Sequence, residues 1–349
     1  MKDTSLSNSS AEEAVGPFLK AGIIGLGVGE RHIAGYEAHP QCRVTVLCDL
    51  NEEALRSCGK RHPGRRLTTR PEDVLDDPSL DIISVAGYDD SHAAQVIAAL
   101  ERGKHVFVEK PLCLSREEAD SIRKAWKRSG KRFSSNLILR LSPRFQALRE
   151  RIASGLFGNL YYVEGDYNYG RIWKITEGWR GRLPFYSVVY GGGVHIVDLL
   201  VFLTGRKIRS VVARGNKICT ANTRFRYNDF NVALLDFEDG MIGKVSSNFG
   251  CVLPHFHQIQ IYGTKRTFLQ TAAGTREYDS REPNDSGHEV SEAYPGIEKG
   301  DLLYNFVEAV LNRAPLLISE EEVFDAMAVC FAIEESAREG KAVEISAIR

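Results

Sequence analysis

The sequence lacks any cysteine pair of the kind that builds a disulfide framework or a zinc ribbon. Its 7 cysteines stand at positions 42, 48, 58, 113, 219, 251 and 330, and no two form a Cys-x-x-Cys pair. An odd number of scattered cysteines indicates reduced thiols that mostly fill a hydrophobic core. We therefore expect a cytoplasmic protein, and no residue cluster in the sequence predicts a metal site.

Long apolar runs are also missing. The best stretch, Val197–Leu203, is interrupted by Asp198 and is far shorter than the ~20 residues that a membrane helix needs. Residues 1–19 lack the basic start and apolar core of a signal peptide and have the composition of a polar, flexible tail. These features predict no membrane partner.

No excess of one charge is present. The chain has 45 Lys plus Arg against 46 Asp plus Glu, a formal net charge of −1, so no overall basic field would attract nucleic acid. What is present is a 43% hydrophobic composition over 349 residues, which is enough for a sizeable core. At ~150 residues a domain, this length favours two domains, or one domain with a large elaboration.

Strands and helices alternate from about residue 20 to about residue 140. Ser115 followed by Glu118 has the spacing of a capping box at a helix start. The alternation predicts a doubly wound, mostly parallel sheet of the Rossmann type, so we assign residues 20–140 to a dinucleotide-binding domain. Strands are expected near 21–25, 43–49, 81–87, 104–110 and 131–137, and helices near 51–61, 71–77, 91–103 and 115–130.

The pattern changes beyond Arg140. After one helix over residues 143–155, longer strand-like segments follow, with turn residues at 238–240 and 262–265 that favour hairpins. Residues 274–300 are polar and rich in turn formers, which predicts a long loop, and two helices close the chain. The sequence thus predicts a C-terminal α+β domain over residues 141–349 with a large, mostly antiparallel sheet.

A glycine-rich turn joins the first strand to the first helix. Gly25, Gly27 and Gly29, with Val28 between them, allow a ligand to approach the backbone, and the free N–H groups at the helix start favour a pyrophosphate. The spacing is Gly-x-Gly-x-Gly, and Glu30 occupies the position where the usual motif has its last glycine. The strand before it and the helix after it still indicate a dinucleotide site.

Asp49 follows the second strand, 24 residues after Gly25. A carboxylate there can accept hydrogen bonds from a ribose diol and repels the 2′-phosphate of NADP. Leu50 and Asn51 supply no arginine to neutralise it, although Arg56 could serve a phosphate. We therefore expect NAD rather than NADP. The alternative is that Asp49 is a solvated residue at the end of a strand.

Several segments resemble the glucose-fructose oxidoreductase, inositol dehydrogenase and MocA (Gfo/Idh/MocA) superfamily. The segments are VFVEKPLCLS over residues 106–115, the glycine turn with His32, DIISVAGYDDSHAAQVIAALERGKHVFVEKPL, the 143–160 helix and linker, and HIVDLLVFLTG over residues 195–205. In that family a Glu-Lys-Pro lies on the strand that faces the nicotinamide. The resemblance covers nearly the whole chain and implies that Glu109 and Lys110 contact the cofactor.

Lys110 is the first expected catalytic residue. A lysine at the carboxyl end of a strand, held by Pro111, can direct its ammonium group at the reacting oxygen of a substrate. The family's peptide bond at this point is cis, so the resemblance implies that Lys110–Pro111 is cis. The alternative is an ordinary solvated lysine.

His195 is the second expected catalytic residue. The resemblance implies that it corresponds to the histidine of the family's Asp-x-Gly-x-His-x-x-Asp motif, that Gly193 corresponds to the glycine, and that Asp198 corresponds to the last carboxylate. An imidazole with a pKa near neutrality can act as general base. Asp198 would orient or support rather than react. A structural histidine is the alternative.

The sequence departs from the family pattern at Gly191, which stands where the family has its first Asp. Either Lys110 and His195 carry proton transfer alone, or the hydroxyl of Tyr190 or Tyr186 substitutes. Each tyrosine could equally pack against the sheet.

Substrate contacts are expected from the segment before His195. Trp179 could stack on a sugar ring, and Arg180, Arg182 and Arg140 could bind a phosphate or carboxylate. The arginines make a phosphorylated or nucleotide-linked sugar plausible. Each of these residues could also be structural.

Two further groups complete the expected site. The resemblance places Tyr88, Asp89 and His92 over the nicotinamide ribose, where His92 could instead be part of the helix start. His255 and His257 share one face of a strand, but no third ligand stands near them, so we expect packing and not a metal.

These expectations describe an NAD-dependent dehydrogenase that oxidises a ring hydroxyl of a sugar, sugar derivative or cyclitol. Its relatives imply two alternatives: an NAD-dependent glycosidase that works by transient oxidation and elimination, and a sugar-sensing or NAD-sensing regulator without turnover. The resemblance also implies a homo-oligomer, a dimer or tetramer, formed through the C-terminal sheet.

Overall fold

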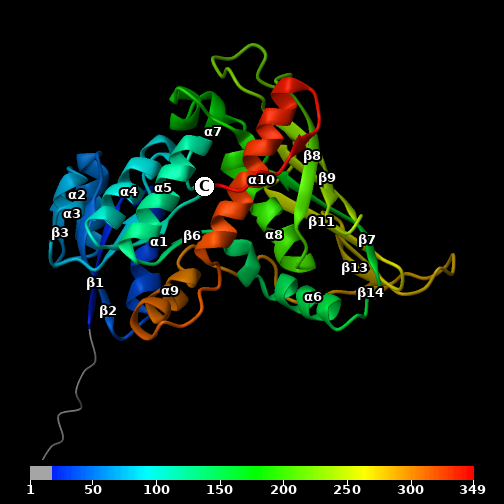
Figure 1. Cartoon of the computed structure of the whole chain (residues 1–349), viewed down its shortest axis with the longest axis horizontal. Helices are drawn as coiled ribbons and strands as arrows, with labels where there is room; N and C mark the ends of the chain where they lie inside the picture. The colour runs from blue at the N-terminus through cyan, green and yellow to red at the C-terminus, as the bar shows by residue number, and fades with distance from the viewer. Residues whose placement is uncertain (1–17) are drawn as a thin grey trace, which may run out of the picture.

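The computed structural model describes residues 18–349 and contains two sheets with helices around and between them (Figure 1). The expected polar tail over residues 1–19 therefore lies almost wholly outside the described residues. None of the helices within residues 18–349 is both long and apolar enough to cross a membrane.

The first sheet is parallel throughout, as predicted. Its strand order is β3-β2-β1-β4-β5-β6, so the order reverses between β1 and β4. The central strands are apolar and buried because helices cover both faces. The strands are β1 (Leu19–Ile24), β2 (Cys42–Cys48), β3 (Arg66–Thr68), β4 (Ile82–Val85), β5 (His105–Val108) and β6 (Phe133–Ser135). The sequence analysis missed β3, a three-residue edge strand with no buried residue.

Local capping explains where several helices of this domain begin. The Asn51 side chain accepts hydrogen bonds from the N–H groups of Glu53 and Ala54, and Ser115 and Glu118 form the predicted capping box. The helices are α1 (Leu26–Glu37), α2 (Glu52–Arg61), α3 (Glu72–Leu75), α4 (His92–Glu101) and α5 (Arg116–Ser129).

The second sheet has nine strands in the order β14-β13-β12-β11-β7-β10-β9-β8-β15. All neighbours are antiparallel except β7 and β10, so the expected mostly antiparallel sheet is confirmed. Its strands are β7 (Leu160–Asn168), β8 (Ile208–Asn216), β9 (Phe230–Phe237), β10 (Ile242–Asn248), β11 (Phe256–Gly263), β12 (Thr267–Thr271), β13 (Gly274–Tyr278), β14 (His288–Glu289) and β15 (Val343–Glu344). The long loop expected over residues 274–300 is wrong in part, because β13 and β14 pair within it.

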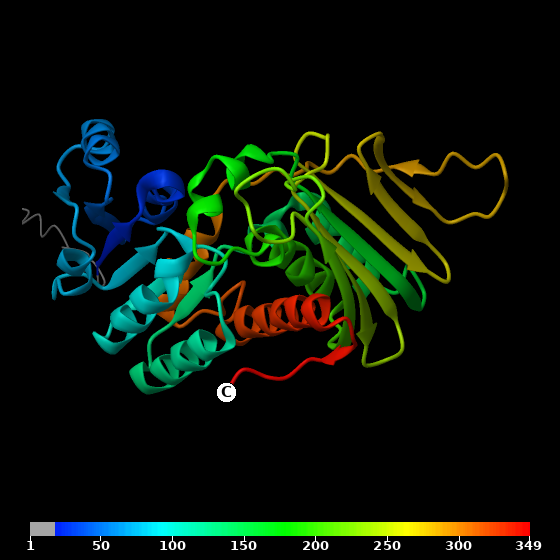
Figure 2. The same ribbon diagram turned by 90° about the horizontal axis from the view of Figure 1, so that it is seen from above.

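Helices α6 (Pro143–Ala153), α7 (Trp173–Thr176) and α8 (Val194–Thr204) belong to the second domain. Helix α10 (Glu320–Glu339) lies between the two sheets and contacts β8, α8, α5 and β6 (Figure 2).

Helix α9 (Asp301–Asn312) packs on the first domain although it follows the second in sequence. A Cβ on Gly35 of α1 would lie 2.3 Å from the carbonyl oxygen of Gly300, so only glycine permits this approach. His39 Nε2 also lies 2.8 Å from Glu308 Oε1. Helix α9 therefore packs with the first sheet and its helices, although its residues fall in the segment expected to form the C-terminal domain.

Candidate active site

A cleft of about 1060 Å³ lies between the two domains. The carboxyl ends of β1, β4 and β5 form one side, at the point where the strand order reverses, which is where open α/β sheets bind ligands. The other side comes from β7, the segment around α7, and the turn before α8. Residues expected from sequence that line it are Gly25, Gly27, Val28, Asp49, Tyr88, Asp89, His92, Glu109, Lys110, Trp179, Arg180, Tyr186 and His195.

The glycine turn is shaped for close approach of a ligand to the backbone. Gly25 has φ of 90°, and a Cβ there would lie 2.4 Å from the carbonyl oxygen of Ala86. A Cβ on Gly29 would lie 2.9 Å from the Ile23 side chain, so this glycine allows helix and strand to pack closely. A Cβ on Gly27 would meet only open space, and α1 begins at Leu26. This geometry fits a dinucleotide pyrophosphate at the start of α1.

Asp49 lies in the cleft lining beside this turn. Its Oδ2 accepts the N–H of Leu26 at 2.7 Å, and its Oδ1 accepts the N–H of Asn51 at 2.8 Å. The carboxylate is therefore held in place, and each oxygen keeps a lone pair for a ribose hydroxyl. Arg56 pairs with Glu52 at 2.9 Å, so it is engaged within its own helix. These residues fit NAD.

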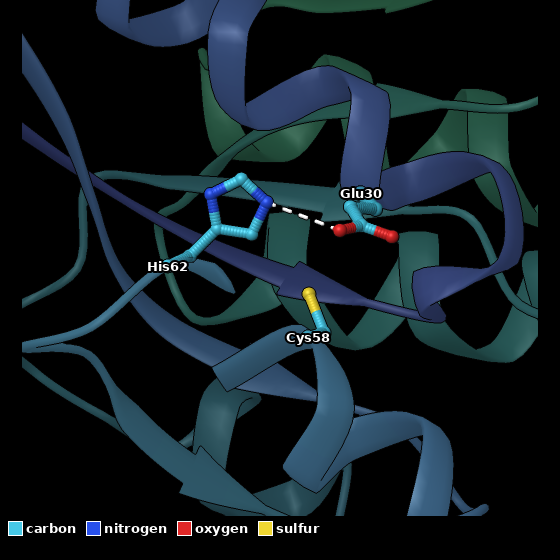
Figure 3. A group of neighbouring side chains, drawn as sticks. All are labelled: Glu30, Cys58 and His62. Atoms are coloured by element: carbon cyan, nitrogen blue, oxygen red, sulfur yellow. Dashed lines mark hydrogen bonds and ion pairs between the residues drawn. The ribbon is translucent and has the colours of Figure 1, made fainter. Parts of the chain in front are cut away.

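Glu30, Cys58 and His62 form the one group among residues 18–349 whose atoms lie close enough together to hold a metal (Figure 3). The sequence analysis did not predict it, because the three residues come from α1 and from the end of α2. Arg61 donates to both oxygens of Glu30, at 2.7 and 2.9 Å, and His62 Nε2 lies 3.1 Å from Oε1. The pairing with Arg61 lowers the pKa of Glu30. The arrangement is that of an ion-pair cluster joining α1 to α2.

Lys110 lies where the two domains meet. Its Nζ donates a hydrogen bond to the carbonyl oxygen of Gly191 at 2.9 Å, and the Lys110–Pro111 peptide bond is cis, as expected. Burial lowers the pKa of Lys110 to about 8, and Arg180 and Lys299 contribute in the same direction against Asp89. At neutral pH the group is therefore still mostly charged, but it can release a proton more easily than a solvated lysine.

Glu109 and His92 fix the backbone around Lys110. Glu109 Oε1 accepts from Asn136 Nδ2 at 2.6 Å and lies 3.3 Å from His32 Nε2. Burial alone would raise the pKa of Glu109, but the bond from His32 and nearby lysines hold it well below its usual range. His92 Nδ1 lies 2.7 Å from the carbonyl oxygen of Pro111.

His195 is buried at the start of α8, directly after a π-helical turn over Val189–Gly193. Burial lowers its pKa well below the usual value, and the charges of Lys110 and Lys299 add to this. The expectation of an imidazole pKa near neutrality is thus wrong, because the ring is buried and has cations near it. His195 is neutral at physiological pH and retains a lone pair that can accept a proton.

Tyr186 occupies the space that a side chain at Gly191 would need. A Cβ on Gly191 would lie 2.1 Å from the Tyr186 hydroxyl oxygen. Tyr186 is 1% exposed, and its hydroxyl has no hydrogen-bond partner among the described residues. Burial raises the pKa of this phenol well above its usual value, so it is a neutral hydroxyl in the cleft wall.

Tyr190, Arg140 and Asp198 lie away from the cleft. Tyr190 packs its ring against Phe185 and Phe331. Arg140 donates to both oxygens of Asp198, at 2.5 and 2.9 Å, and all three residues are absent from the cleft lining. The structure thus corrects the expected substrate contacts of Arg140 and Asp198, whose charges satisfy each other in the core, and it directs Tyr190 away from any reacting group.

Trp179 and Arg180 do reach the cleft. The Trp179 ring stacks on Tyr88 with centroids 4.7 Å apart, which joins the two domains over the cleft. The guanidinium of Arg180 lies 4.4 Å from the Trp179 ring centroid. Arg182 is exposed and does not line the cleft, contrary to expectation.

Sequence reasoning missed several lining residues, all brought in by tertiary folding. Lys299 comes from a segment expected to be loop, and Tyr167 and Tyr169 alternate at the end of β7. Tyr167 lies against His195, His255 and His257, with ring centroids 6.1, 5.1 and 5.1 Å away. His255 was expected to pack and instead lines the cleft. Also missed were Arg171, Lys174 and Phe249.

A parallel Rossmann domain with a glycine turn, an acidic strand end and a lysine facing a second domain defines a two-domain, nucleotide-dependent oxidoreductase. Family comparison agrees. The family model described as 'Oxidoreductase family, NAD-binding Rossmann fold' matches residues 19–137. The family model of the GFO/IDH/MocA C-terminal domain matches residues 145–269. The chain belongs to this oxidoreductase family, as the sequence analysis expected.

Named relatives agree over long stretches. Myo-inositol 2-dehydrogenase of Thermotoga maritima is 22% identical over 344 residues, covering 95% of this chain and 99% of the relative. Inositol 2-dehydrogenase of Paracoccus denitrificans is 32% identical over 250 residues, covering 70% and 71%. The solved structure of levoglucosan dehydrogenase in complex with NADH and levoglucosan has the same fold, with a TM-score of 0.81 at 20% identity, covering 94% of this chain and 99% of that one.

Proposed function

We propose that this protein transfers hydride between NAD and a ring hydroxyl or ketone of a sugar, sugar derivative or cyclitol. One observation carries the proposal: Lys110 of the first domain and His195 of the second line the same cleft, and Lys110 bonds the turn that precedes His195. The names of the inositol dehydrogenases and of levoglucosan dehydrogenase support this substrate class.

The turn around Gly25 and the carboxylate of Asp49 would hold the cofactor. When bound, NAD supplies a nicotinamide ring that accepts or returns a hydride. The chain's own residues then manage the charge on the substrate oxygen. The Lys110 ammonium group stabilises negative charge on that oxygen, and the neutral His195 ring accepts its proton. Tyr186, a neutral donor on the same wall, is proposed to hold the oxygen where Gly191 offers no side chain.

A substrate panel tests this proposal. Sugars, sugar acids, sugar phosphates, nucleotide sugars and inositols would be incubated with NAD or NADP, and the nicotinamide absorbance followed. We expect turnover with NAD for at least one polyol class, and Lys110→Ala should reduce kcat by about 10²- to 10⁴-fold while NAD still binds. Full activity in Lys110→Ala would refute the catalytic assignment.

The same panel separates the alternatives. Release of a free sugar from a glycoside without net NADH formation would indicate the glycosidase. NAD and sugar binding without any product would indicate the sensor.

We also propose that copies of the chain associate through the outer face of the second sheet. Val212 of β8 and Leu234 of β9 are paired across the strands, and both side chains are exposed there. Ile242 of β10 is exposed on a neighbouring strand. The free cysteines support a reducing cytoplasmic location.

A further inference from the structure

One end of the cleft carries positively charged side chains that have no acidic partner. Arg171, Lys174 and Arg180 come from the segment after β7, and Lys299 comes from the segment before α9. Among residues 18–349 none of these four side-chain cations forms an ion pair or donates a side-chain hydrogen bond. The guanidinium of Arg180 lies 4.4 Å from the ring centroid of Trp179, and that of Arg171 lies 5.3 Å from the ring centroid of Tyr169.

This pattern differs from that of other arginines that are withdrawn from water. Arg140 is held by Asp198 and Glu322, and Arg151 by Glu277 and Glu292. A charged group that is partly withdrawn from water costs free energy unless it is paired. Arg180 is such a group: Asp89 lies near enough to act on its charge, but no side chain among residues 18–349 forms an ion pair with it.

The nearby acids do not balance these cations. Glu109 stays ionised beside Lys110 and Lys299, so its charge offsets part of theirs, but it is not among the groups that act on Arg180. Asp89 is buried, and burial raises its pKa, so the charge that it offers Arg180 and Lys110 is weakened. Glu30 and Asp49 lie at the opposite end, beside the glycine turn, where each has its own partners.

Three histidines near these cations, His195, His255 and His257, are neutral mainly because they are buried. Burial, with the charges of Arg171, Lys299 and Lys110 in the same direction, lowers the pKa of His255 to about 4. Burial, His255 and Lys299 lower the pKa of His257 to about 3. Neutral histidines add no charge, so the cations are left for a ligand.

The cofactor's own phosphates do not account for this set. The Gly25 turn and the start of α1 are the proposed phosphate site, and they belong to the first domain. Arg171, Lys174 and Arg180 belong to the second domain, on the same side of the cleft as His195 and Tyr186.

We propose that the substrate carries an anionic group, a carboxylate or a phosphate, in addition to its reacting ring hydroxyl, and that Arg180 and Arg171 bind this group with Lys299 beside them. Arginine presents a planar fork that matches the oxygens of both groups. The Tyr169 and Trp179 rings beside the two arginines supply flat apolar surface for a sugar ring. This inference rests on the proposed function, because it names the substrate class of that site.

The test compares neutral and anionic forms of one sugar series. Hexoses, hexuronates, hexose phosphates and nucleoside diphosphate hexuronates would be assayed with NAD and wild-type protein. We expect kcat/KM for one anionic class to exceed that for its neutral parent by at least about 10-fold, since a hydrogen bond to a charged group contributes about 1.5 to 3 kcal/mol. The preferred class distinguishes a carboxylate from a phosphate.

Variants locate the effect. Arg180→Gln and Arg171→Gln should each lower kcat/KM for the anionic substrate by about 10- to 100-fold, mainly through KM, and leave the Kd for NAD unchanged. Arg182→Gln is the matched control, because Arg182 lies in the same turn as Arg180 but is exposed and outside the cleft. Equal activity on neutral and anionic sugars, or wild-type KM in Arg180→Gln, overturns the inference.

Calorimetry separates this inference from the proposed function. If the NAD-loaded protein binds a sugar acid or sugar phosphate and Arg180→Gln loses that affinity, the anion site stands even without turnover. Turnover of neutral sugars alone supports the proposed function and refutes the anion site.

Discussion

Tyr186 has a buried hydroxyl without a partner among the described residues, at the position that a side chain of residue 191 would occupy. A buried hydroxyl without a hydrogen-bond partner lowers the free energy of unfolding by about 1 to 3 kcal/mol, and proteins often keep such a group where function needs it. Tyr186→Phe should therefore leave the Tm unchanged or raise it, while kcat falls by about 10-fold or more. Thermal unfolding measures the Tm, and steady-state kinetics measure kcat. A lower Tm together with unchanged kcat would assign Tyr186 to packing alone.

Lys110 gives a prediction for pH dependence. Burial lowers its pKa to about 8, so the ammonium form is present below that pH and is lost as pH rises through it. Because ketone reduction needs the charged form, kcat/KM for reduction should fall above about pH 8. Oxidation needs the neutral His195 ring, and the pKa of His195 lies well below 6.5, so no loss of the oxidation rate is expected between pH 6.5 and neutrality. The profile would be measured from about pH 6 to about pH 10, and a constant rate across it contradicts the assignment of Lys110.

Arg140 joins three elements rather than binding a ligand. It follows β6, Asp198 lies on α8, and Glu322 lies in the first turn of α10. Arg140→Met would leave the buried Asp198 carboxylate unpaired, which costs about 3 to 5 kcal/mol. We expect a lower midpoint in urea unfolding, with kcat/KM of the folded enzyme within about threefold of wild type, since the kinetics of an intact site do not depend on this pair. A matched Arg149→Met change, at an arginine that contacts only the Phe202 ring at 4.3 Å, should cost much less.

The elements themselves show what sequence can predict. The Gly25 turn, Asp49 and the Ser115 capping box depend on neighbours within a few residues or on one βαβ unit, so their patterns are visible in the chain. Arg140 depends on Asp198, which is far away in sequence, and Lys299 reaches the cleft only through the tertiary fold. An arginine that will be buried in an ion pair has the same local pattern as one that binds a ligand. The fold was therefore predictable, whereas the assignment of cations to core or cleft required tertiary structure.

At the scale of the whole molecule, the outer face of the second sheet is the surface through which we propose that copies of the chain associate. One face of this sheet is covered by α6, α8 and α10 (Figure 1), while Val212, Leu234 and Ile242 remain exposed. Exposed apolar residues that align across neighbouring strands are typical of a surface that binds another protein. Leu234 is 54% exposed at the centre of this group, so a charge there would be tolerated by the fold.

Leu234→Glu should convert a dimer or tetramer to a smaller species, because a desolvated, unpaired carboxylate opposes association. Size-exclusion chromatography with light scattering measures the mass, and a chain of 38.9 kDa makes monomer and dimer easy to separate. Leu253→Glu, at another exposed leucine that follows β10 and lies outside these strands, is the control. Because the cleft is built from one chain, kcat should survive in the smaller species. An unchanged mass in Leu234→Glu, or a monomeric wild type, would place any association elsewhere.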